Sequence, residues 1–314
     1  MKSKALAALQ GKRVLLTGAS GALGMELQQI FAGTTSQLLA TARDRAGAEH
    51  LDVLDGDQVR RCFAEFKPDV VIHLAAIVPI PQIEKDHGRA FMVNVVGLDN
   101  VLKEFESLGL PGRVVVVSSS EVYGNGTPGR KFTESDRFSP NNFYAYTKVA
   151  QEELAELYVK RGVDIKIARV FNYSSAFKKP VYSLESFASQ IASIVKGGGK
   201  REIVVGNLEP ERDFIQGYDA AEALLAIAND PTKTAAFNVS RGETVSMRGL
   251  LEMIIREFGV DVEIVVDRAK YRTIDNLYVC GDNTLLRNTG WNVTMSVNEM
   301  IAKLVRHHRS GSGQ

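Results

Sequence analysis

The stretch "TGASGALG", residues 17–24, decides the fold class. It directly follows the apolar run "RVLLT" (13–17), and apolar residues at helical spacing begin at Leu23, just behind the turn. A strand, a glycine turn and a helix in this order present backbone N–H groups to a pyrophosphate at the start of the helix. Three glycines permit the tight bend and the close approach of the ligand: Gly18, Gly21 and Gly24. The sequence therefore predicts a dinucleotide-binding site at this turn.

The end of the second strand indicates which dinucleotide is bound. A dinucleotide site usually has an acid there, which binds the ribose 2′-hydroxyl. This chain instead reads "LLATARDR" (38–45), in which Arg43 and Arg45 flank Asp44. Arginine suits a 2′-phosphate, so NADP is the first expectation, while NAD stays open through Asp44 or a backbone group. Asp52 follows in the chain and is expected to meet the adenine amino group.

Strands and helices alternate through the first half of the chain. "DVVIHLAA" (69–76) and "RVVVVSSS" (113–120) contain continuous apolar runs, which are typical of strands covered on both faces. Helical patterns lie before and between them, at 59–66 and 94–109. This alternation predicts an α/β fold, a doubly wound parallel sheet of the Rossmann type with a smaller C-terminal substrate lobe.

The predicted division places the NAD(P)-binding domain at residues 1–170 and the lobe at 171–314. The two are expected to interleave, with a strand near 235–240 returning to the first domain. The other elements predicted in the second half are a helix at 184–196, a strand at 202–206, a helix at 219–230 and a strand at 262–266.

The overall composition is that of a soluble globular protein. Of 314 residues, 45% are hydrophobic and 24% are charged, and the net charge is +1. This balance gives no reason to expect nucleic acid or an anionic membrane as a partner. Cys62 and Cys280 are the only cysteines, and the five histidines form no HExxH motif, so neither a disulfide framework nor a metal site is expected. No apolar segment is long enough to cross a bilayer, and we expect a cytoplasmic protein.

The segment "NNFYAYTKVA", residues 141–150, contains two tyrosines close to a lysine. Tyr144 and Lys148 stand at i and i+4, which share one face of a helix, whereas Tyr146 points away from both. A free tyrosine has a pKa of about 10, so a shift to about 7 requires roughly 4 kcal/mol of preference for the phenolate. The same helix is expected to bury Ala150, Leu154, Leu157 and Tyr158.

Five motifs together resemble the extended short-chain dehydrogenase/reductases, which include nucleotide-sugar epimerases, dehydratases and reductases. They are "TGASGALG", "LDVLD" (51–55), "VIHLAA" (71–76), "SSSEVYG" (118–124) and "YAYTK" (144–148). The resemblance covers about residues 12–305. In the second half, "RVFN" (169–172), "SFASQIA" (186–192), "VGNLEPERDF" (205–214) and "YRTIDNLYVCGD" (271–282) are similar to the GDP-hexose branch. That branch contains GDP-mannose 4,6-dehydratases and GDP-4-keto-6-deoxymannose reductases.

The resemblance implies roles for particular residues. Tyr144 would exchange a proton with the sugar C4 oxygen, with Lys148 as its electrostatic helper, and Ser119 would bind the same oxygen. Glu121 occupies the position of the acid/base of the dehydratases. Some reductases of the GDP-sugar branch also carry a glutamate there, whereas plain 4-epimerases usually lack a carboxylate. Ser118 and Ser120 are expected to be strand-end structure. The implied cofactor contacts are Gly18, Ser20, Gly21, Ala22, Leu23, Gly24, Arg43, Asp52, Val53, Leu74, Ala75, Ala76 and Lys148. The implied substrate contacts are Ser119, Asn172, Arg212 and Arg272.

Two departures from the family pattern leave the nucleotide base open. Thr273 replaces the proline that usually follows the arginine at 272, and "NYSSAFKK" (172–179) replaces a Gly-Pro turn. The implied function is C4 redox chemistry on a GDP-hexose, as a 4-ketoreductase or a 4,6-dehydratase. The alternatives are a nucleotide-sugar 4-epimerase and a non-catalytic NADP-sensing protein. By analogy with similar enzymes, a homodimer would form through helices 94–109 and 144–160.

Overall fold

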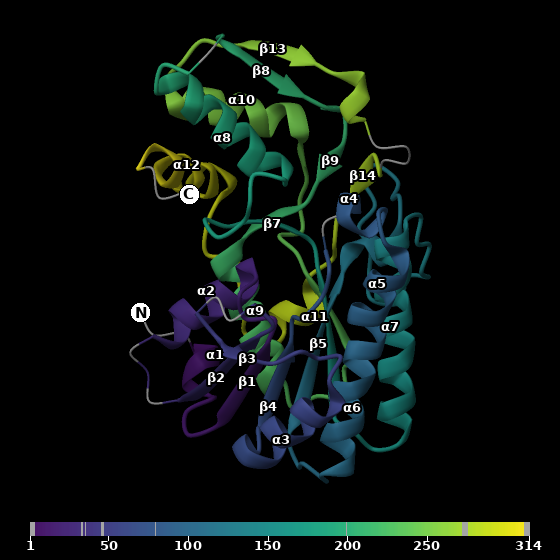
Figure 1. The fold of residues 1–314 in the computed structure, drawn as a ribbon. Helices are drawn as coiled ribbons and strands as arrows, with labels where there is room; N and C mark the ends of the chain where they lie inside the picture. The colour runs from purple at the N-terminus through teal and green to yellow at the C-terminus, as the bar shows by residue number, and fades with distance from the viewer. Residues whose placement is uncertain are drawn as a thin grey trace.

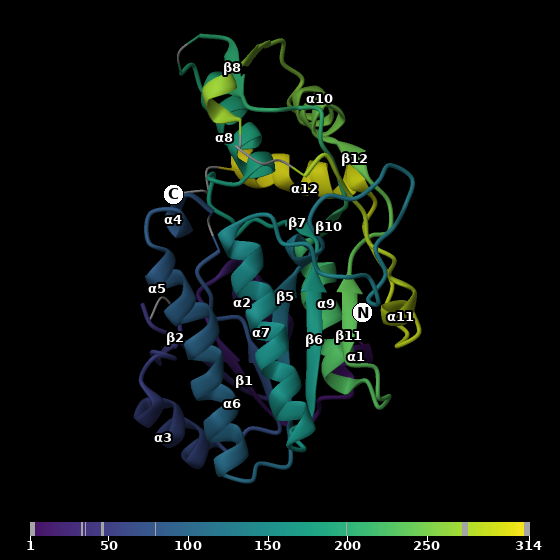
Figure 2. The same ribbon diagram turned by 90° about the vertical axis from the view of Figure 1, so that its right-hand side faces the viewer.

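The computed structural model describes residues 4–32, 34, 36–44, 47–78, 80–198, 200–271 and 276–310. Among these residues the largest sheet has seven parallel strands in the order β11-β6-β5-β4-β1-β2-β3 (Figures 1 and 2). Its strands are β1 (Arg13–Thr17), β2 (Gln37–Ala42), β3 (Glu49–His50), β4 (Val70–His73), β5 (Arg113–Ser119), β6 (Ile165–Val170) and β11 (Ala236–Val239). The strand order reverses between β1 and β4, so the predicted doubly wound sheet is confirmed, and ligands of such sheets bind at the carboxyl ends of these two strands.

Helices cover both faces of this sheet because successive residues of each strand point to opposite sides. Val14 and Leu16 of β1 lie in one apolar core, while Leu15 lies in the other. The first core also takes apolar side chains from α1 (Lys4–Ala7), α2 (Ala22–Phe31) and α9 (Gly217–Asn229), and the second takes them from α3 (Gly56–Phe66), α6 (Gly97–Ser107) and α7 (Phe143–Lys160). Figure 2 shows α7 alongside the strands and β11 beside β6.

Short helices connect these elements. They are α4 (Ile80–Ile83), α5 (His87–Phe91), the π-helical turn η1 (Met92–Val96), the 3₁₀ turn η2 (Ser120–Tyr123) and α11 (Thr284–Arg287). The helix predicted at 94–109 is thus a π turn followed by α6. Asn94, inside this turn, is buried, and its side chain bonds to the backbone of Ile77 and to the hydroxyl of Thr147 on α7. The turn therefore ties the chain after β4 to the start of α7.

A smaller lobe stands above the carboxyl ends of the strands (Figure 1). Its elements are β7 (Asn172–Ser174), α8 (Ser183–Val195), β8 (Glu202–Val205), β9 (Glu211–Arg212), β10 (Phe214–Gln216), β12 (Val245–Ser246), α10 (Met247–Phe258), β13 (Glu263–Val266), η3 (Arg268–Lys270), β14 (Tyr278–Val279) and α12 (Val297–Arg309). Helices α8, α10 and α12 share an apolar core with β8. Neither α10 nor α12 is among the predicted elements, although Ser296 and Glu299 form a capping box that signals the start of α12.

The predicted buried face of α7 is wrong at Leu157, which is 56% exposed. The buried face of this helix carries polar side chains, including Lys148, Gln151 and Glu152, which an apolar periodicity search passes over. A prediction from apolar spacing alone therefore places the inner face too far round the helix. Within the described ranges, no helix combines the length and apolar character needed to span a bilayer.

Candidate active site at the carboxyl ends of β1, β4 and β5

Tyr144 and Tyr146 point in different directions from the first turn of α7. Tyr144 is 8% exposed, whereas Tyr146 is 53% exposed. Asn142 fixes the start of the helix, because its Oδ1 accepts a hydrogen bond from the N–H of Ala145 at 2.8 Å. Helical spacing then brings Lys148 to the Tyr144 side, with its Nζ 5.8 Å from the centroid of the Tyr144 ring. The structure thus brings Tyr144 and Lys148 together and leaves Tyr146 outside.

The Tyr144 hydroxyl meets the end of β5, where it is hydrogen-bonded to Ser119. Burial raises the pKa of Tyr144 above its ordinary value, and the negative charge of Glu121 raises it further. The hydrogen bond from Ser119 acts in the opposite direction without reversing the shift. The phenol of Tyr144 therefore carries its proton at neutral pH, which is the form that a proton donor needs.

Lys148 is buried beneath this tyrosine. Its Nζ donates a hydrogen bond to the carbonyl oxygen of Val117 at 2.9 Å. Burial lowers the pKa of Lys148 to about 8, while Glu152, one helical turn later, opposes that shift. The pKa of His73 on β4 is lowered to about 3, first by burial and then by the Lys148 charge, so this imidazole is neutral. Within the described residues Nζ makes this one hydrogen bond, so two N–H groups remain for a ligand such as a ribose.

Glu121 lies in η2, directly after the strand that carries Ser119, and it is half-buried. Its Oε2 accepts hydrogen bonds from the Nδ2 groups of Asn142, at 3.0 Å, and Asn276, at 3.4 Å. Since Asn142 also caps α7, the Glu121 carboxylate is held at the same helix end as Tyr144. Its charge acts on the Tyr144 phenol, so the two groups belong to one site.

The glycine turn approaches β4 too closely to admit a side chain. Gly18 has a φ of +67°, and a Cβ there would lie 2.6 Å from the backbone nitrogen of Ala75. A Cβ on Gly24 would lie 2.5 Å from the carbonyl oxygen of Ala19, so α2 packs directly on the turn. The predicted contacts on the turn and the start of α2 are Ser20, Gly21, Ala22 and Leu23, and those after β4 are Leu74, Ala75 and Ala76. This backbone cradle at the start of a helix fits a dinucleotide pyrophosphate.

The residues predicted for the adenosine half follow β2 and β3. Arg43 is exposed directly after β2, and its guanidinium has no hydrogen-bond partner within the described residues, so it is available to a phosphate. Arg45 lies outside the described residues. Asp52 is half-buried, and its Oδ1 accepts a hydrogen bond from the N–H of Leu54 at 3.0 Å. Val53 is buried against Gly97, the first residue of α6, and a Cβ added to that glycine would collide with the Val53 side chain. The loop that carries Val53 is therefore packed closely on α6.

The predicted substrate residues come from the lobe. Asn172 begins β7 and is half-buried, and β7 pairs with β10. Arg212 ends β9, is buried, and donates from Nη1 to the carbonyl oxygen of its neighbour Glu211 at 3.1 Å. Arg272 and Thr273 lie outside the described residues.

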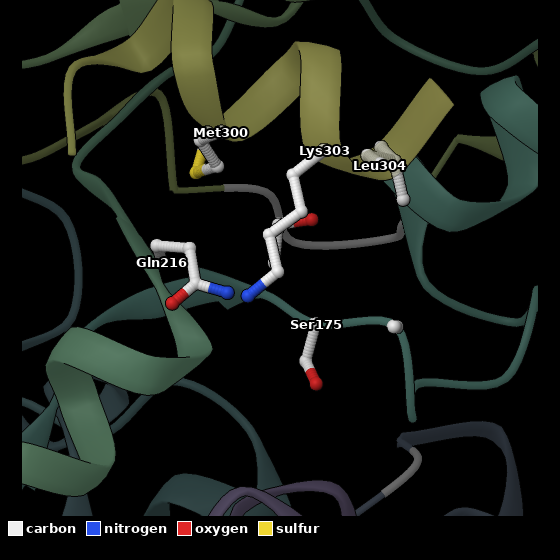
Figure 3. A pocket seen from close by; sticks show the side chains of 7 residues that line it. Ser175, Gln216, Met300, Lys303 and Leu304 are labelled. Atoms are coloured by element: carbon white, nitrogen blue, oxygen red, sulfur yellow. The ribbon is translucent and has the colours of Figure 1, made fainter. Parts of the chain in front are cut away.

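A small cavity lies where the lobe meets the sheet domain (Figure 3). Figure 3 shows Lys303 of α12 directing its amino nitrogen toward Gln216, above Ser175. Ser175 donates a hydrogen bond from Oγ to buried Glu26 of α2 at 2.6 Å, so polar contacts join the lobe to the sheet domain here. The cavity measures about 10 Å³, which suits one water molecule and not a nucleotide sugar. A hollow of about 560 Å³ beside α3 is lined by none of the predicted site residues.

Sequence reasoning missed the polar residues that support this site. Glu152 and Arg169 form a buried ion pair, and Ser118, expected only as strand-end structure, donates to Glu152. Sequence reasoning also missed Asn142 and Asn276, whose side-chain amides hold the Glu121 carboxylate. An asparagine before a helix is a capping signal that identifies Asn142, but no sequence pattern indicates the partner of its side chain.

The comparison with known proteins agrees with this geometry. Residues 14–240 match the NAD dependent epimerase/dehydratase family. The chain is 28% identical over 298 residues to GDP-6-deoxy-D-mannose reductase of Pseudomonas aeruginosa, which covers 94% of this chain and 96% of that protein.

Two solved structures share the fold over almost the whole chain. RMD from Pseudomonas aeruginosa, complexed with NADPH, superposes with a TM-score of 0.87 at 27% identity, covering 96% of this chain and 99% of that one. UDP-glucose 4-epimerase from Thermotoga maritima, with UDP-glucose, superposes with a TM-score of 0.87 at 19% identity, with the same coverage. The resemblance drawn from the sequence motifs is confirmed, and the chain belongs to the NAD dependent epimerase/dehydratase family.

Proposed function

We propose that this protein is an NADPH-dependent reductase that acts at C4 of a GDP-linked keto-hexose. The observation that carries the proposal is the buried Tyr144 phenol, which is hydrogen-bonded to Ser119 and stands beside Lys148. Its raised pKa keeps the proton on the phenol, and the reduction of a ketone consumes one proton. Similarity to GDP-6-deoxy-D-mannose reductase along nearly the whole chain supports the class of sugar.

In this reaction bound NADPH supplies the hydride that reduces the ketone carbon. Tyr144 donates its proton to the carbonyl oxygen as negative charge develops on that oxygen, and the Ser119 hydroxyl donates a hydrogen bond to the same atom. Tyr144 is then a phenolate, which the Lys148 ammonium stabilises until the phenol regains a proton from solvent. One hydride and one proton thus convert the C=O group into CH–OH.

The cofactor and substrate contacts are part of the proposal. Arg43, exposed at the end of β2, would bind the 2′-phosphate of NADPH, in line with the NADPH found in the similar RMD structure. Asn172, Arg212 and Arg272 would hold the nucleotide diphosphate. We also propose a cytoplasmic location, where the two unpaired cysteines would stay reduced.

A second candidate function is 4,6-dehydration, and the position of Glu121 favours it. Dehydration needs a base for the C5 proton and an acid for the leaving C6 hydroxyl, and one carboxylate beside the sugar can serve in both steps. Glu121 lies close enough to Tyr144 to affect the pKa of the phenol, and two asparagine amides orient it. A 4-ketoreductase needs no such group.

The variant Glu121→Gln separates the two functions because it keeps the shape of the side chain and removes its titration. Loss of the C6 hydroxyl from GDP-mannose is followed by mass, and NADPH consumption is followed with a GDP-linked 4-keto-6-deoxyhexose. For a reductase, we expect wild type to leave GDP-mannose intact and the variant to keep most of its turnover. A dehydratase should lose about 10²–10⁴-fold in turnover. If wild type acts on neither compound, the proposed substrate class is wrong.

We also propose a homodimer that buries the outer faces of η1, α6 and α7. Tyr146 and Leu157 of α7 are exposed and share one face of the helix, about three turns apart, and Met92 of η1 is exposed as well. Exposed large apolar side chains on one face are typical of interaction surfaces. Light scattering should give twice the monomer mass at micromolar concentration, and Leu157→Glu should give the monomer. A monomeric wild-type protein would contradict the proposal.

A further inference from the structure

A buried ion pair lies behind the Tyr144–Lys148 face of α7. Glu152 and Arg169 of β6 are each 6% exposed. Arg169 donates from Nε to Glu152 Oε2 at 3.0 Å and from Nη2 to the same oxygen at 2.8 Å. Replacing a buried ion pair by apolar residues often leaves a protein equally stable or more stable, because burying two charges costs free energy. Stability alone therefore does not account for this pair.

The pair holds both ends of the strand-end segment, residues 118–123, which carries Ser119 and Glu121. At the first end, Ser118 donates from Oγ to Glu152 Oε1 at 2.5 Å. At the other end, Arg169 donates from Nη1 to the hydroxyl oxygen of Tyr123 at 2.8 Å, and that hydroxyl donates to Asn238 on β11 at 2.7 Å. The segment is thus bonded at both ends to one charge pair.

The same pair also acts on the helix face that carries the lysine. Glu152 follows Lys148 by one turn, and its charge raises the pKa of Lys148 against the effect of burial. Within the part of the chain that the structure describes, the titratable groups near Lys148 include Tyr144 on the same helix, neutral His73 on β4 and, through Glu152, Arg169 on β6. Among these groups Glu152 is the one that carries a negative charge.

We propose that Glu152, clamped by Arg169, is a positioning residue that holds Ser119 and Glu121 in register with Tyr144. Glu152 is not expected to touch the sugar or the cofactor. It acts through Ser118 on the strand-end segment and through its charge on Lys148. The proposal rests on the proposed function for its turnover assay and is independent of the identity of the sugar base.

The positional part is tested by Ser118→Ala, with Ser120→Ala as its matched control. Both serines are buried and flank Ser119, but of the two only Ser118 has a side-chain hydrogen bond to Glu152. Ser118→Ala should lower kcat for reduction of the 4-keto sugar by about 10- to 100-fold, because small displacements of reacting groups have effects of that size. NADPH affinity should be unchanged, and Ser120→Ala should keep the wild-type kcat.

The electrostatic part is tested by Glu152→Gln, with exposed Glu153→Gln as its control. NADPH affinity is measured by calorimetry as a function of pH, and this readout needs no sugar. We call the fall of NADPH affinity at high pH the alkaline limb of NADPH binding. Loss of the Glu152 charge should move this limb to lower pH, because Lys148 then loses its proton at a lower pH. Glu153→Gln and Ser118→Ala should leave the limb in place. A purely structural ion pair would change the melting temperature and leave the limb unmoved.

The outcomes separate this proposal from the proposed function. If the wild-type protein binds NADPH but reduces no 4-keto sugar, the proposed function is wrong. The alkaline limb of NADPH binding in Glu152→Gln then still tests the positioning proposal. If Glu152→Gln does not fold because Arg169 is left buried and unpaired, Ser118→Ala against Ser120→Ala decides it. Wild-type kcat in folded Ser118→Ala, or an unmoved limb in folded Glu152→Gln, overturns it.

Discussion

Replacing Tyr144 with phenylalanine removes one hydroxyl from the buried face of α7 and leaves the ring in place. The cost in folding is the lost hydrogen bond with Ser119, which is worth about 0.5–1.5 kcal/mol. A domain typically has about 5–15 kcal/mol of stability, so the variant should fold. The cost in catalysis is larger, because the proton donor is gone. We expect kcat to fall by about 10²–10⁴-fold, or about 2.7–5.4 kcal/mol at the transition state.

Tyr146→Phe makes the same chemical change two residues away on an exposed side chain. This variant should retain wild-type kcat, because substitutions on the surface away from the site rarely matter by more than about 0.5 kcal/mol. The assay follows loss of the reduced-nicotinamide absorbance with a GDP-linked 4-keto-6-deoxyhexose, and calorimetry measures NADPH binding in both variants. Full activity in Tyr144→Phe, or inactivity in Tyr146→Phe with an intact fold, would refute the assignment.

Three further predictions follow from the cofactor region. Arg43→Ala should weaken NADPH more than NADH in calorimetry, since it removes a charge-assisted contact to the 2′-phosphate, and equal losses would exclude that contact. The kcat/KM for NADPH should fall as pH rises through about 8, where Lys148 loses its charge, and a fall only near the ordinary lysine value of 10.5 would show that burial does not control this group. Gly18→Ala should abolish NADPH binding, because the added Cβ would lie 2.6 Å from the backbone of Ala75. Gly47→Ala is the control: Gly47 has a similar φ of +69°, but its Cβ would meet open space, so this variant should only lower the melting temperature. Equal effects of the two variants on NADPH binding would argue against the proposed pyrophosphate cradle.

The main sheet was predictable because its strands are covered on both faces. A strand buried on both sides appears in the sequence as a continuous apolar run, as in "RVVVVSSS". This pattern can be recognised without knowing which helices cover the strand. The lobe was predicted less completely, because several of its strands have only two or three residues. Its helices α10 and α12 were missed although their buried apolar residues recur at helical spacing. The inner face of α7 was misplaced because polar side chains, and not only apolar ones, fill it.

The sequence by itself determined the features that depend only on neighbouring residues. These are the glycine turn after β1, the i and i+4 pairing of Tyr144 with Lys148, and the arginine after β2. Only the tertiary structure decided which distant groups meet. Glu152 lies against Ser118 and Arg169, and the carboxylate of Glu121 is held by Asn142 and Asn276. These partners come from different strands, helices and loops, and their contacts depend on strand register and on how α7 and the lobe pack against the sheet. No local pattern in the chain encodes that packing, so these contacts could not be read from the sequence.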